Sequence, residues 1–435
     1  MQSNVLAGVA SAVLLLIGIG SSGLDVRAQA SQAAAPAVAA PAAEDNDPVR
    51  TLVGRLDLEK YKATIKGLTQ FGDRRQGTDR NRAAIDWIGA QLKSYGCTNT
   101  ERIKYDYQPP AGRGTGAGAG QGAARGEGRG QGAAAAGGQR GGSRGRAGQG
   151  GSTIFGNRAR TGVNNDPNAQ PDLKLRELNS QPSTPGLREQ VFCTKIGTTR
   201  PEEMYIVGGH MDGIGYGEAA NDDGSGTALV MELARIFSSP DVQTERSIRF
   251  ALWNNEETGL NGARAYVEQR KDLQGKEDPP GSRRFPEPKW LGMIQHDMMM
   301  FDHGMPGPDG KVSAEQRPEA DVNIEFQSIA KMADEAQKLA WFFKAANEKY
   351  ATDYPAAVGP HMTNTDSTPF MDLVPAISLR ENERGAQIGG GWDPHWHQVT
   401  DVFTTFSDKD FRLGLNAAQT TLAAVAQLTG ATVKK

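Results

Sequence analysis

The sequence predicts a single α/β domain with a mixed, mostly parallel central sheet that helices cover on both faces. Short apolar segments alternate with amphipathic segments over residues 204–428, which is typical of strands that alternate with helices. Hydrophobic residues make up 37% of the 435 residues, which is enough for one sizeable core. These two observations favour a layered α/β fold over an all-α or all-β fold.

The first elements lie before the alternating region. Asp79 begins a helix whose apolar residues recur at helical spacing, and Gly96 ends it. Residues 101–108 alternate as a half-buried strand, and residues 189–196 read as a second strand, antiparallel to the first. Cys97 and Cys193 flank this hairpin and could pair in an oxidising compartment, although their expected positions along the strands do not match well.

The alternating region supplies the rest of the sheet. The expected strands are residues 204–209, 247–253, 289–297, 322–326 and 374–379. The expected helices are one with Leu229, Val230, Leu233, Ile236 and Phe237 on one face, then residues 260–269 and 328–349, and a last one that Ser407 caps with Asp410. Ligands of such sheets bind beyond the carboxyl ends of the strands.

The N-terminal residues have the character of a targeting segment. Residues 5–24 are apolar or small, and Ala28-Gln29-Ala30 gives a cleavage pattern, so residues 1–30 are predicted to be a signal peptide of a secreted or periplasmic protein. An uncleaved membrane anchor is the alternative. Residues 31–47 form an Ala/Pro-rich tether, and no later apolar run is long enough to span a membrane.

Glycine is concentrated in one part of the chain. Of its 54 glycines, 18 lie in residues 111–151, so the domain (48–435) is predicted to carry a disordered Gly/Arg-rich insertion at about 109–186. Residues 111–160 carry a charge of +7, which leaves −10 for the remainder of a chain whose net charge is −3. An acidic body argues against nucleic acid as its partner. The insertion lacks aromatic residues, so we expect a linker, with RNA or anionic-surface binding as the alternative.

Residues with imidazole or carboxylate side chains follow the predicted strands. They are His210 and Asp212, Glu256 and Glu257, and Asp297, to which the loop residue Asp222 and the late His397 are added. Taken singly, Asp222 with Asp223 could cap a helix, and Glu256-Glu257 could be a solvated pair. Together they would bury several carboxylates, which is costly without cations. Carboxylate and imidazole ligands without thiolate suit zinc, manganese or cobalt.

The adjacent residues Glu256 and Glu257 could have two different chemical roles. Adjacent side chains do not easily point the same way, so one can bind a metal while the other accepts a proton from an activated water that attacks a carbonyl. Two metals bridged by one carboxylate would both activate water and polarise the carbonyl.

Six motifs in order resemble those of the M28 family of co-catalytic zinc peptidases, which includes secreted aminopeptidases and carboxypeptidase Q-like enzymes. They are HMD (210–212), ANDDGSG (220–226), NNEETGLNGA (254–263), HDM (296–298), TDSTPF (365–370) and HQVTDV (397–402). The resemblance covers residues 70–108 and 188–428 and implies a zinc-exopeptidase-like fold.

The resemblance also implies roles. His210 and Asp297 would bind one Zn²⁺, His397 and Glu257 would bind a second, and Asp222 would bridge them, with Mn²⁺ or Co²⁺ as possible substitutes. Glu256 would be the general base.

Supporting roles follow from the same resemblance. Asp212 and Asp401 would orient the imidazoles of His210 and His397. Asp366 matches an acidic position near the site. The sequence lacks the Tyr that some relatives place before the TDS motif, and His361 is the nearest side chain able to hydrogen-bond there.

The other candidate residues are expected to have structural or supporting roles. His296 and His395 are expected to support the site rather than bind metal, and His303 to lie in a loop. Trp392 and Trp396 line the mouth of the pocket or pack in the core.

Four functions remain to be weighed. A secreted two-zinc aminopeptidase acting on peptides is preferred, because the surplus of carboxylates favours a substrate α-ammonium group. A carboxypeptidase or dipeptidase would grip a carboxylate, for which Arg380 and Arg384 are candidates. A single-zinc glutaminyl cyclase and a receptor-type binding module without metals share the fold, but both His210 and Asp297 are retained.

Overall fold

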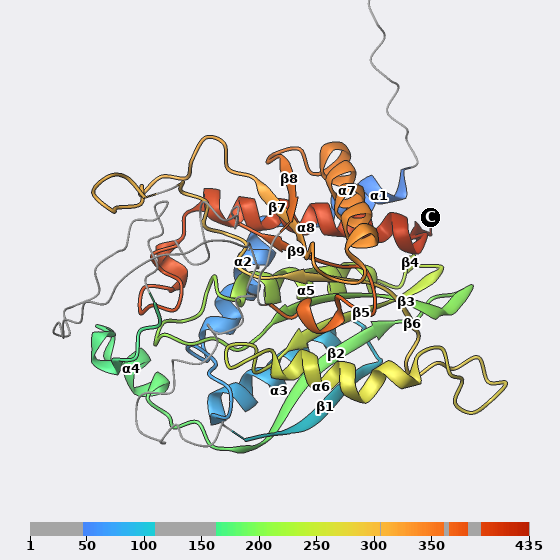
Figure 1. The fold of residues 1–435 in the computed structure, drawn as a ribbon, viewed down its shortest axis with the longest axis horizontal. Helices are drawn as coiled ribbons and strands as arrows, with labels where there is room; N and C mark the ends of the chain where they lie inside the picture. Colours follow the sequence, from blue (N-terminus) through green and yellow to red (C-terminus); the bar gives the residue numbers. More distant parts are fainter. Residues whose placement is uncertain (1–46, 109–161, 305, 361–364, 382–392, 435) are drawn as a thin grey trace, which may run out of the picture. The chain divides into compact units, whose positions relative to one another are not determined.

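The computed structural model describes residues 47–108, 162–304, 306–360, 365–381 and 393–434 (Figure 1). The predicted signal peptide, nearly all of the tether and most of the insertion lie outside the described residues. The same holds for His361, Arg384 and Trp392.

An eight-stranded sheet forms the centre of the domain (Figure 1). In sheet order its strands are β1 (Thr100–Tyr107), β2 (Gly186–Lys195), β5 (Arg246–Trp253), β3 (Arg200–His210), β6 (Lys289–His296), β9 (Ala376–Arg380), β7 (Val322–Phe326) and β8 (Ala356–Pro360). The four middle strands β5, β3, β6 and β9 run parallel, whereas β1, β2 and β7 pair antiparallel to a neighbour. This arrangement confirms the predicted mixed, mostly parallel sheet.

Helices cover both faces of the sheet, but unevenly. The larger core lies on the face covered by α1 (Pro48–Val53), α2 (Leu58–Thr69), α3 (Asp79–Ser94), α5 (Gly224–Phe237), α7 (Ala333–Tyr350) and α8 (Asp408–Thr429). A smaller, aromatic core lies beneath α6 (Asn261–Arg270) and η3 (Thr368–Phe370). Strand β5 is buried on both faces of the sheet: Phe250 points into the larger core and Trp253 into the smaller one.

The structure differs from the predicted elements in a few places. The helix expected over 328–349 begins at Ala333, and the first residues of that range form turns. Helices α1 and α2 and strand β8 were not predicted; the helices are N-capped by Asp47 and Asp57. A small second sheet pairs β4 (Val242–Gln243) with β10 (Thr432–Val433).

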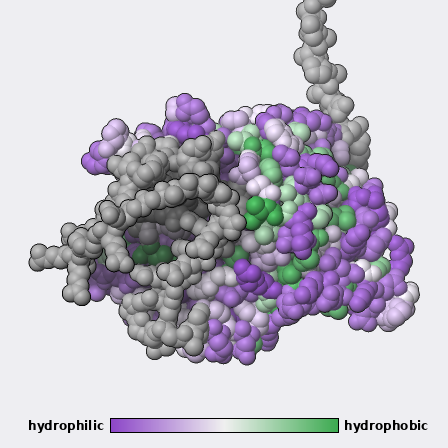
Figure 2. Space-filling model, viewed as in Figure 1, coloured by the Kyte–Doolittle hydropathy of each residue, from purple (hydrophilic) through white to green (hydrophobic). Residues whose placement is uncertain are grey.

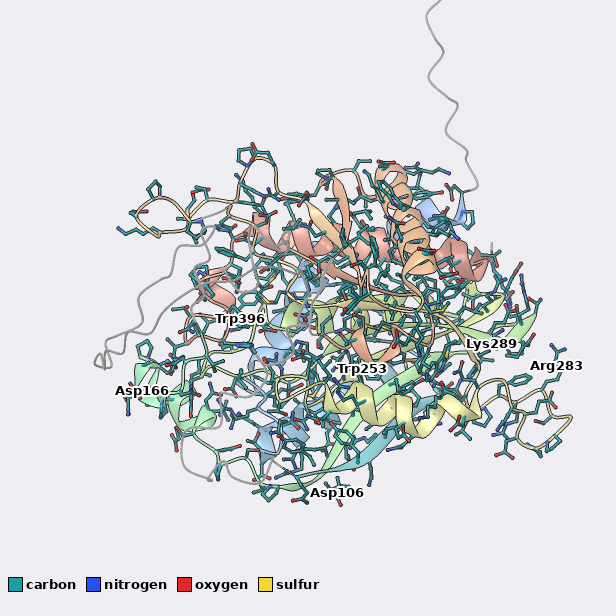
Figure 3. The ribbon with its side chains drawn as sticks, in the orientation of Figure 1. Asp106, Asp166, Trp253, Arg283, Lys289 and Trp396 are labelled. Atoms are coloured by element: carbon teal, nitrogen blue, oxygen red, sulfur yellow. A yellow bond between two sulfur atoms is a disulfide. The ribbon has the colours of Figure 1, made fainter. Side chains whose placement is uncertain are left out.

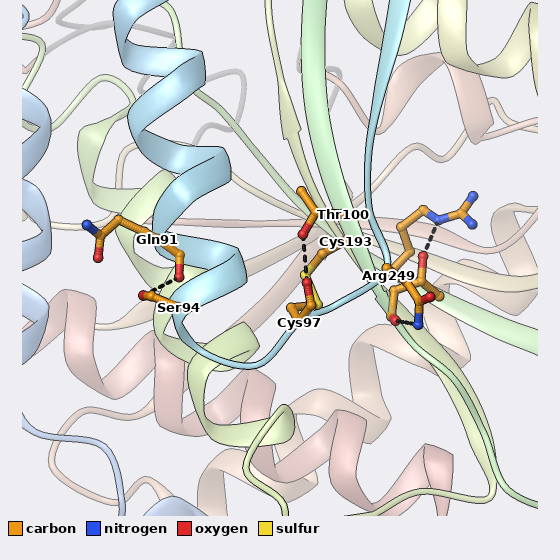
Figure 4. The surroundings of a disulfide bond; sticks show 8 residues. Gln91, Ser94, Cys97, Thr100, Cys193 and Arg249 are labelled. Atoms are coloured by element: carbon orange, nitrogen blue, oxygen red, sulfur yellow. Dashed lines mark hydrogen bonds between the residues drawn. A yellow bond between two sulfur atoms is a disulfide. The ribbon is translucent and has the colours of Figure 1, made fainter.

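Cys97 and Cys193 form a disulfide bond with their Cα atoms 6.0 Å apart (Figure 4). The expected mismatch of their positions is therefore wrong. Cys193 pairs with Thr100 in the β1–β2 ladder, and Cys97 lies in the turn before β1. The Thr100 hydroxyl donates to the Cys97 carbonyl oxygen at 2.7 Å, which folds that turn back toward Cys193.

The last part of the expected insertion is ordered. Residues 162–186 contain the 3-10 turn η1 (Pro167–Ala169) and helix α4 (Leu173–Asn179). The buried Asn179 side chain accepts from the Asp73 backbone N–H at 3.0 Å and donates to the Gly217 carbonyl at 2.7 Å. These bonds to distant segments fix a stretch whose sequence shows no periodic apolar pattern.

The described helices are all too short or too polar to cross a membrane. Hydrophilic residues prevail around the edge of the face in Figure 2, with apolar residues nearer its centre.

Candidate metal centre

His210 ends β3 and points its ring into a group of carboxylates. Its Nδ1 lies 2.9 Å from the Asp212 backbone carbonyl, so its Nε2 faces Asp222 Oδ1 at 3.3 Å and Asp297 Oδ1 at 3.8 Å. The ring is 1% exposed. Asp212 thus orients His210 through its main chain, and its Oδ1 accepts from the Glu256 backbone N–H at 3.0 Å.

The loop after β3 brings Asp222 between two imidazoles. Asp222 Oδ2 lies 2.9 Å from His397 Nε2, while its Oδ1 faces His210. Asp223, joined to it by a cis peptide bond, caps α5 by accepting from the Gly226 N–H at 2.8 Å. The capping interpretation therefore holds for Asp223, and Asp222 is directed into the site.

The Glu256-Glu257 pair after β5 divides between two groups of donor atoms. Donor atoms of Glu256, His210 and Asp297 lie within 4.8 Å of one another, as do those of Glu257, His210 and Asp222. Glu257 Oε2 also lies 2.8 Å from His397 Nε2. The two adjacent glutamates therefore serve different halves of one cluster.

His397 comes from an irregular segment and has a positive φ of 57°. The His397 ring stacks on the ring of Trp396, with the two centroids 4.0 Å apart (Trp396 is labelled in Figure 3). Its Nδ1 has no hydrogen-bond partner among the described residues. Asp401 does not orient this ring; instead it accepts from the backbone N–H groups of Asn221 at 2.8 Å and Asp222 at 3.1 Å.

Segments distant in sequence hold the His397 backbone in place. The Asn164 N–H donates to the His397 carbonyl at 3.0 Å. The Gln170 amide donates to the carbonyls of Tyr216 at 2.8 Å and Val399 at 3.1 Å. Gly215 has φ +99°, and a Cβ there would lie 2.3 Å from the His397 carbonyl carbon. Sequence reasoning missed this support, because residues 162–170 were assigned to the insertion.

Asp297 follows β6 and is held from its outer side. Its Oδ2 accepts from Arg380 Nη2 at 2.9 Å, and Arg380, the last residue of β9, is 1% exposed. The sequence had suggested Arg380 as a grip for a substrate carboxylate, whereas the buried guanidinium pairs with Asp297 and Glu325.

The buried carboxylate of Asp366 interacts electrostatically with residues of the same cluster. Its carboxylate oxygens have no hydrogen-bond partner among the described residues. Burial raises its pKa well above the usual range, and the charge of His210 opposes this rise. The predicted acidic position therefore lies close enough to interact with the ligand candidates.

Burial and mutual repulsion shift the protonation of the cluster. Burial raises the pKa of Glu256 well above its usual value and that of Glu257 to about 7. Burial alone would lower the pKa of His397, but the charges of Glu257 and Asp222 outweigh it and raise the pKa to about 10. Several carboxylates thus share a buried space with two imidazoles and the Arg380 guanidinium, and divalent ions fit this set of nitrogen and oxygen donors.

Among the described residues, His296, His303 and His395 make structural contacts. His296 Nδ1 lies 3.0 Å from the Gly208 carbonyl, and its Nε2 lies 2.8 Å from the Thr421 hydroxyl. His395 bonds Thr400, and His303 bonds Asp410 at 2.8 Å.

Comparison with known sequences gives a consistent assignment. The pattern of peptidase family M28 matches residues 191–421. A probable lipoprotein aminopeptidase, LpqL, from Mycobacterium tuberculosis is 27% identical over 239 residues, which are 53% of this chain and 43% of the relative. Carboxypeptidase Q of Xenopus laevis is 36% identical over 76 residues, which are 18% of this chain and 16% of the relative. The chain thus spans less than half the length of these curated relatives.

Solved structures share the fold. BSAP, a zinc aminopeptidase from Bacillus subtilis, superimposes with a TM-score of 0.53 at 14% identity, over 87% of this chain and 96% of that one. A glutaminyl cyclase from Porphyromonas gingivalis superimposes with a TM-score of 0.50 at 15% identity, over 86% and 99%. At such low identities the likeness concerns the fold alone.

Proposed function

The chain belongs to peptidase family M28, and from this premise we propose that it is a secreted two-zinc aminopeptidase. One observation carries the proposal: Asp222 turns one oxygen toward His210 and the other toward His397. A carboxylate in that position can bridge two ions, one on each side.

Each half of the cluster supplies donors for one ion. His210 and Asp297 would hold the first ion, and His397 and Glu257 the second. When bound, the two zinc ions supply an activated water and a polarised substrate carbonyl. The donor set contains imidazole nitrogen and carboxylate oxygen, which is an ordinary set for zinc.

Glu256 is the proposed proton carrier. Its carboxylate belongs to the same donor group as His210 and Asp297, and burial raises its pKa well above the usual value. A glutamate with a raised pKa can accept a proton from the attacking water and return it to the leaving amine. The bond from Asp212 to the Glu256 N–H fixes the backbone at this position.

The charge balance favours an amino terminus over a carboxyl terminus as the group recognised. Asp366 adds a further buried acid to the cluster, and Arg380 is buried in pairs with Asp297 and Glu325. A substrate α-ammonium group would meet a surplus of carboxylates, whereas a terminal carboxylate would need a cation exposed to the site.

Secretion is part of the proposal. The predicted signal peptide of residues 1–30 would direct export, and the Cys97–Cys193 bond is suited to an oxidising compartment. Sequencing the N-terminus of the exported protein tests this, and an intact Met1 would contradict cleavage.

The decisive test uses blocked substrates. Aminoacyl amides and dipeptides with either terminus blocked are incubated with the full-length protein, with and without a chelator, and zinc is counted per chain. Hydrolysis that needs a free amino terminus and is lost with the chelator is expected. Cleavage only at free carboxyl termini would indicate a carboxypeptidase. One zinc per chain with cyclisation of amino-terminal glutamine, and no hydrolysis, would indicate a glutaminyl cyclase.

A further inference from the structure

Arg380 occupies a buried position directly behind one of the proposed ligands. It ends β9, which pairs with β6 in parallel, and the Asp297 N–H donates to the Leu379 carbonyl at 3.3 Å. This pairing sets Arg380 and Asp297 side by side at the carboxyl ends of two inner strands of the sheet. The guanidinium lies between two carboxylates, with Nη2 2.9 Å from Asp297 Oδ2 and Nε 3.5 Å from Glu325 Oε2.

The contact divides the two oxygens of Asp297. Oδ2 is held by a charged hydrogen bond from Arg380, while Oδ1 is turned toward His210 Nε2 at 3.8 Å. A carboxylate held in this way presents one oxygen toward an ion. Its negative charge is also partly balanced by the guanidinium, which weakens it as a donor to a dication.

The other half of the cluster has a different charge environment. Glu257 Oε2 and Asp222 Oδ2 lie 2.8 and 2.9 Å from His397 Nε2. In the part of the chain that the structure describes, no Lys or Arg forms an ion pair with Asp222 or Glu257 within 4.0 Å. Glu257 therefore lacks the guanidinium contact that Asp297 has. Arg380 also interacts at longer range with Asp222, but Asp222 is shared by both halves, so the difference between them lies in Asp297 and Glu257.

We infer that Arg380 makes the two metal positions unequal, so that the ion between His210 and Asp297 is bound more weakly than the ion beside His397 and Glu257. The inference rests on the proposed function, because it presupposes two ions. It assigns Arg380 as a positioning residue that acts through Asp297. The chain would retain one ion readily and acquire the second from its surroundings.

Two effects of Arg380 must be separated. The guanidinium orients Asp297, which favours binding, and it repels a dication, which opposes binding. Arg380→Gln keeps a donor and removes the charge, whereas Arg380→Lys keeps the charge and loses the planar fork. If charge dominates, only the Gln variant tightens the weak position; if orientation dominates, both variants loosen it.

The experiment measures metal binding without substrate. Metal-free full-length protein is titrated with zinc in competition with a chromophoric chelator, which yields the dissociation constant of each ion. Wild type is expected to show two unequal constants. Because a charge that repels the ion is removed, Arg380→Gln should tighten the weaker one by about tenfold or more and leave the tighter one unchanged, while Arg380→Lys should resemble wild type. His210→Ala should remove the weaker event alone.

Glu325 provides the matched controls. Glu325→Gln leaves the Arg380 charge less balanced and should not tighten the weak position. The double variant with Arg380→Gln removes the Glu325 charge together with that of the guanidinium it faces, and it replaces the single variant if that variant does not fold.

Each outcome decides the question. Two equal constants in wild type would overturn the inference. So would a weak constant that tightens neither in Arg380→Gln nor in the double variant Arg380→Gln with Glu325→Gln. If wild type binds one ion and Arg380→Gln binds two, the inference is supported. If wild type and Arg380→Gln each bind one ion, both the inference and the two-zinc proposal are overturned. Unequal constants that respond as expected in a protein without peptidase activity would uphold the inference and contradict the function.

Discussion

The two halves of the proposed metal centre are held by different kinds of structure. His210 is the last residue of β3, and Glu256 and Asp297 follow β5 and β6, which are both hydrogen-bonded neighbours of β3 in the central sheet. Their relative positions are therefore set by strand register. His397 lies in the irregular segment 393–402, where no ladder fixes its place.

The loop-borne half relies on contacts from remote parts of the chain. The Asn164 N–H bonds the His397 carbonyl, and Gln170 joins the Tyr216 and Val399 carbonyls. A sheet can therefore present the proposed ligands through its own register, whereas a proposed ligand on a loop needs a dedicated set of supports. The sheet-borne half should therefore tolerate changes in its surroundings better than the loop-borne half.

The largest expected effect comes from the residue shared by both halves. Asp222→Ala removes the carboxylate that faces both imidazoles, so both ions should be lost and the two halves should fail together. Metal content per chain after dialysis measures this. The exposed Asp309→Ala serves as control, and retention of one ion in Asp222→Ala would contradict a shared bridge.

Glu256→Gln should separate chemistry from metal binding. The amide keeps the shape of the side chain but cannot accept the proton, so turnover should fall about 10²- to 10⁴-fold while both ions remain. Peptidase rates and zinc content are measured on the same sample. A loss of zinc that parallels the loss of rate would show that Glu256 is a ligand instead.

Acid should destabilise the folded domain through His296, the last residue of β6. This buried ring bonds the Gly208 carbonyl and the Thr421 hydroxyl, and burial lowers its pKa from 6.5 to about 4. The folded state therefore favours the neutral ring. Its contribution is full above pH 6.5 and is lost as the pH falls toward 4, up to about 3 kcal/mol.

Urea unfolding between pH 7 and pH 4 measures this effect. His296→Gln should flatten the loss of stability over that interval, because the titrating group is gone. An unchanged pH slope in the variant would show that other groups govern the acid response.

The smallest effect tests the remote support of His397. Gln170→Ala removes the bonds to the Tyr216 and Val399 carbonyls, so the ion beside His397 should bind about tenfold more weakly, with little change at His210. Zinc titration of the variant is compared with Asn165→Ala, an exposed neighbour. Equal weakening of both ions would contradict the separation into halves.

The sequence predicted that His210, Glu256 and Asp297 lie close together, and they do so for a physical reason. Apolar runs mark buried strands, and parallel strands must converge at their carboxyl ends, so the residues after them meet. The support from residues 162–170 was not predictable, because it consists of single side-chain bonds to backbone carbonyls and leaves no periodic signal.

Other misses share that origin. Asp212 contacts the His210 ring, as expected, but it does so with its backbone carbonyl. The Asp401 side chain bonds the backbone N–H groups of Asn221 and Asp222 rather than the ring it was expected to orient. The pairing of Arg380 with Asp297 depends on the neighbouring order of β6 and β9, which spacing along the chain does not encode. Apolar patterning indicates which elements are buried, but the choice among polar partners is made by the three-dimensional arrangement.

The Cys97–Cys193 bond joins positions 96 residues apart and closes the stretch between β1 and β2 into a covalent ring. A protease that cut this ring once would therefore release nothing. The product would migrate as a single species in non-reducing electrophoresis and separate into two fragments only after a thiol is added.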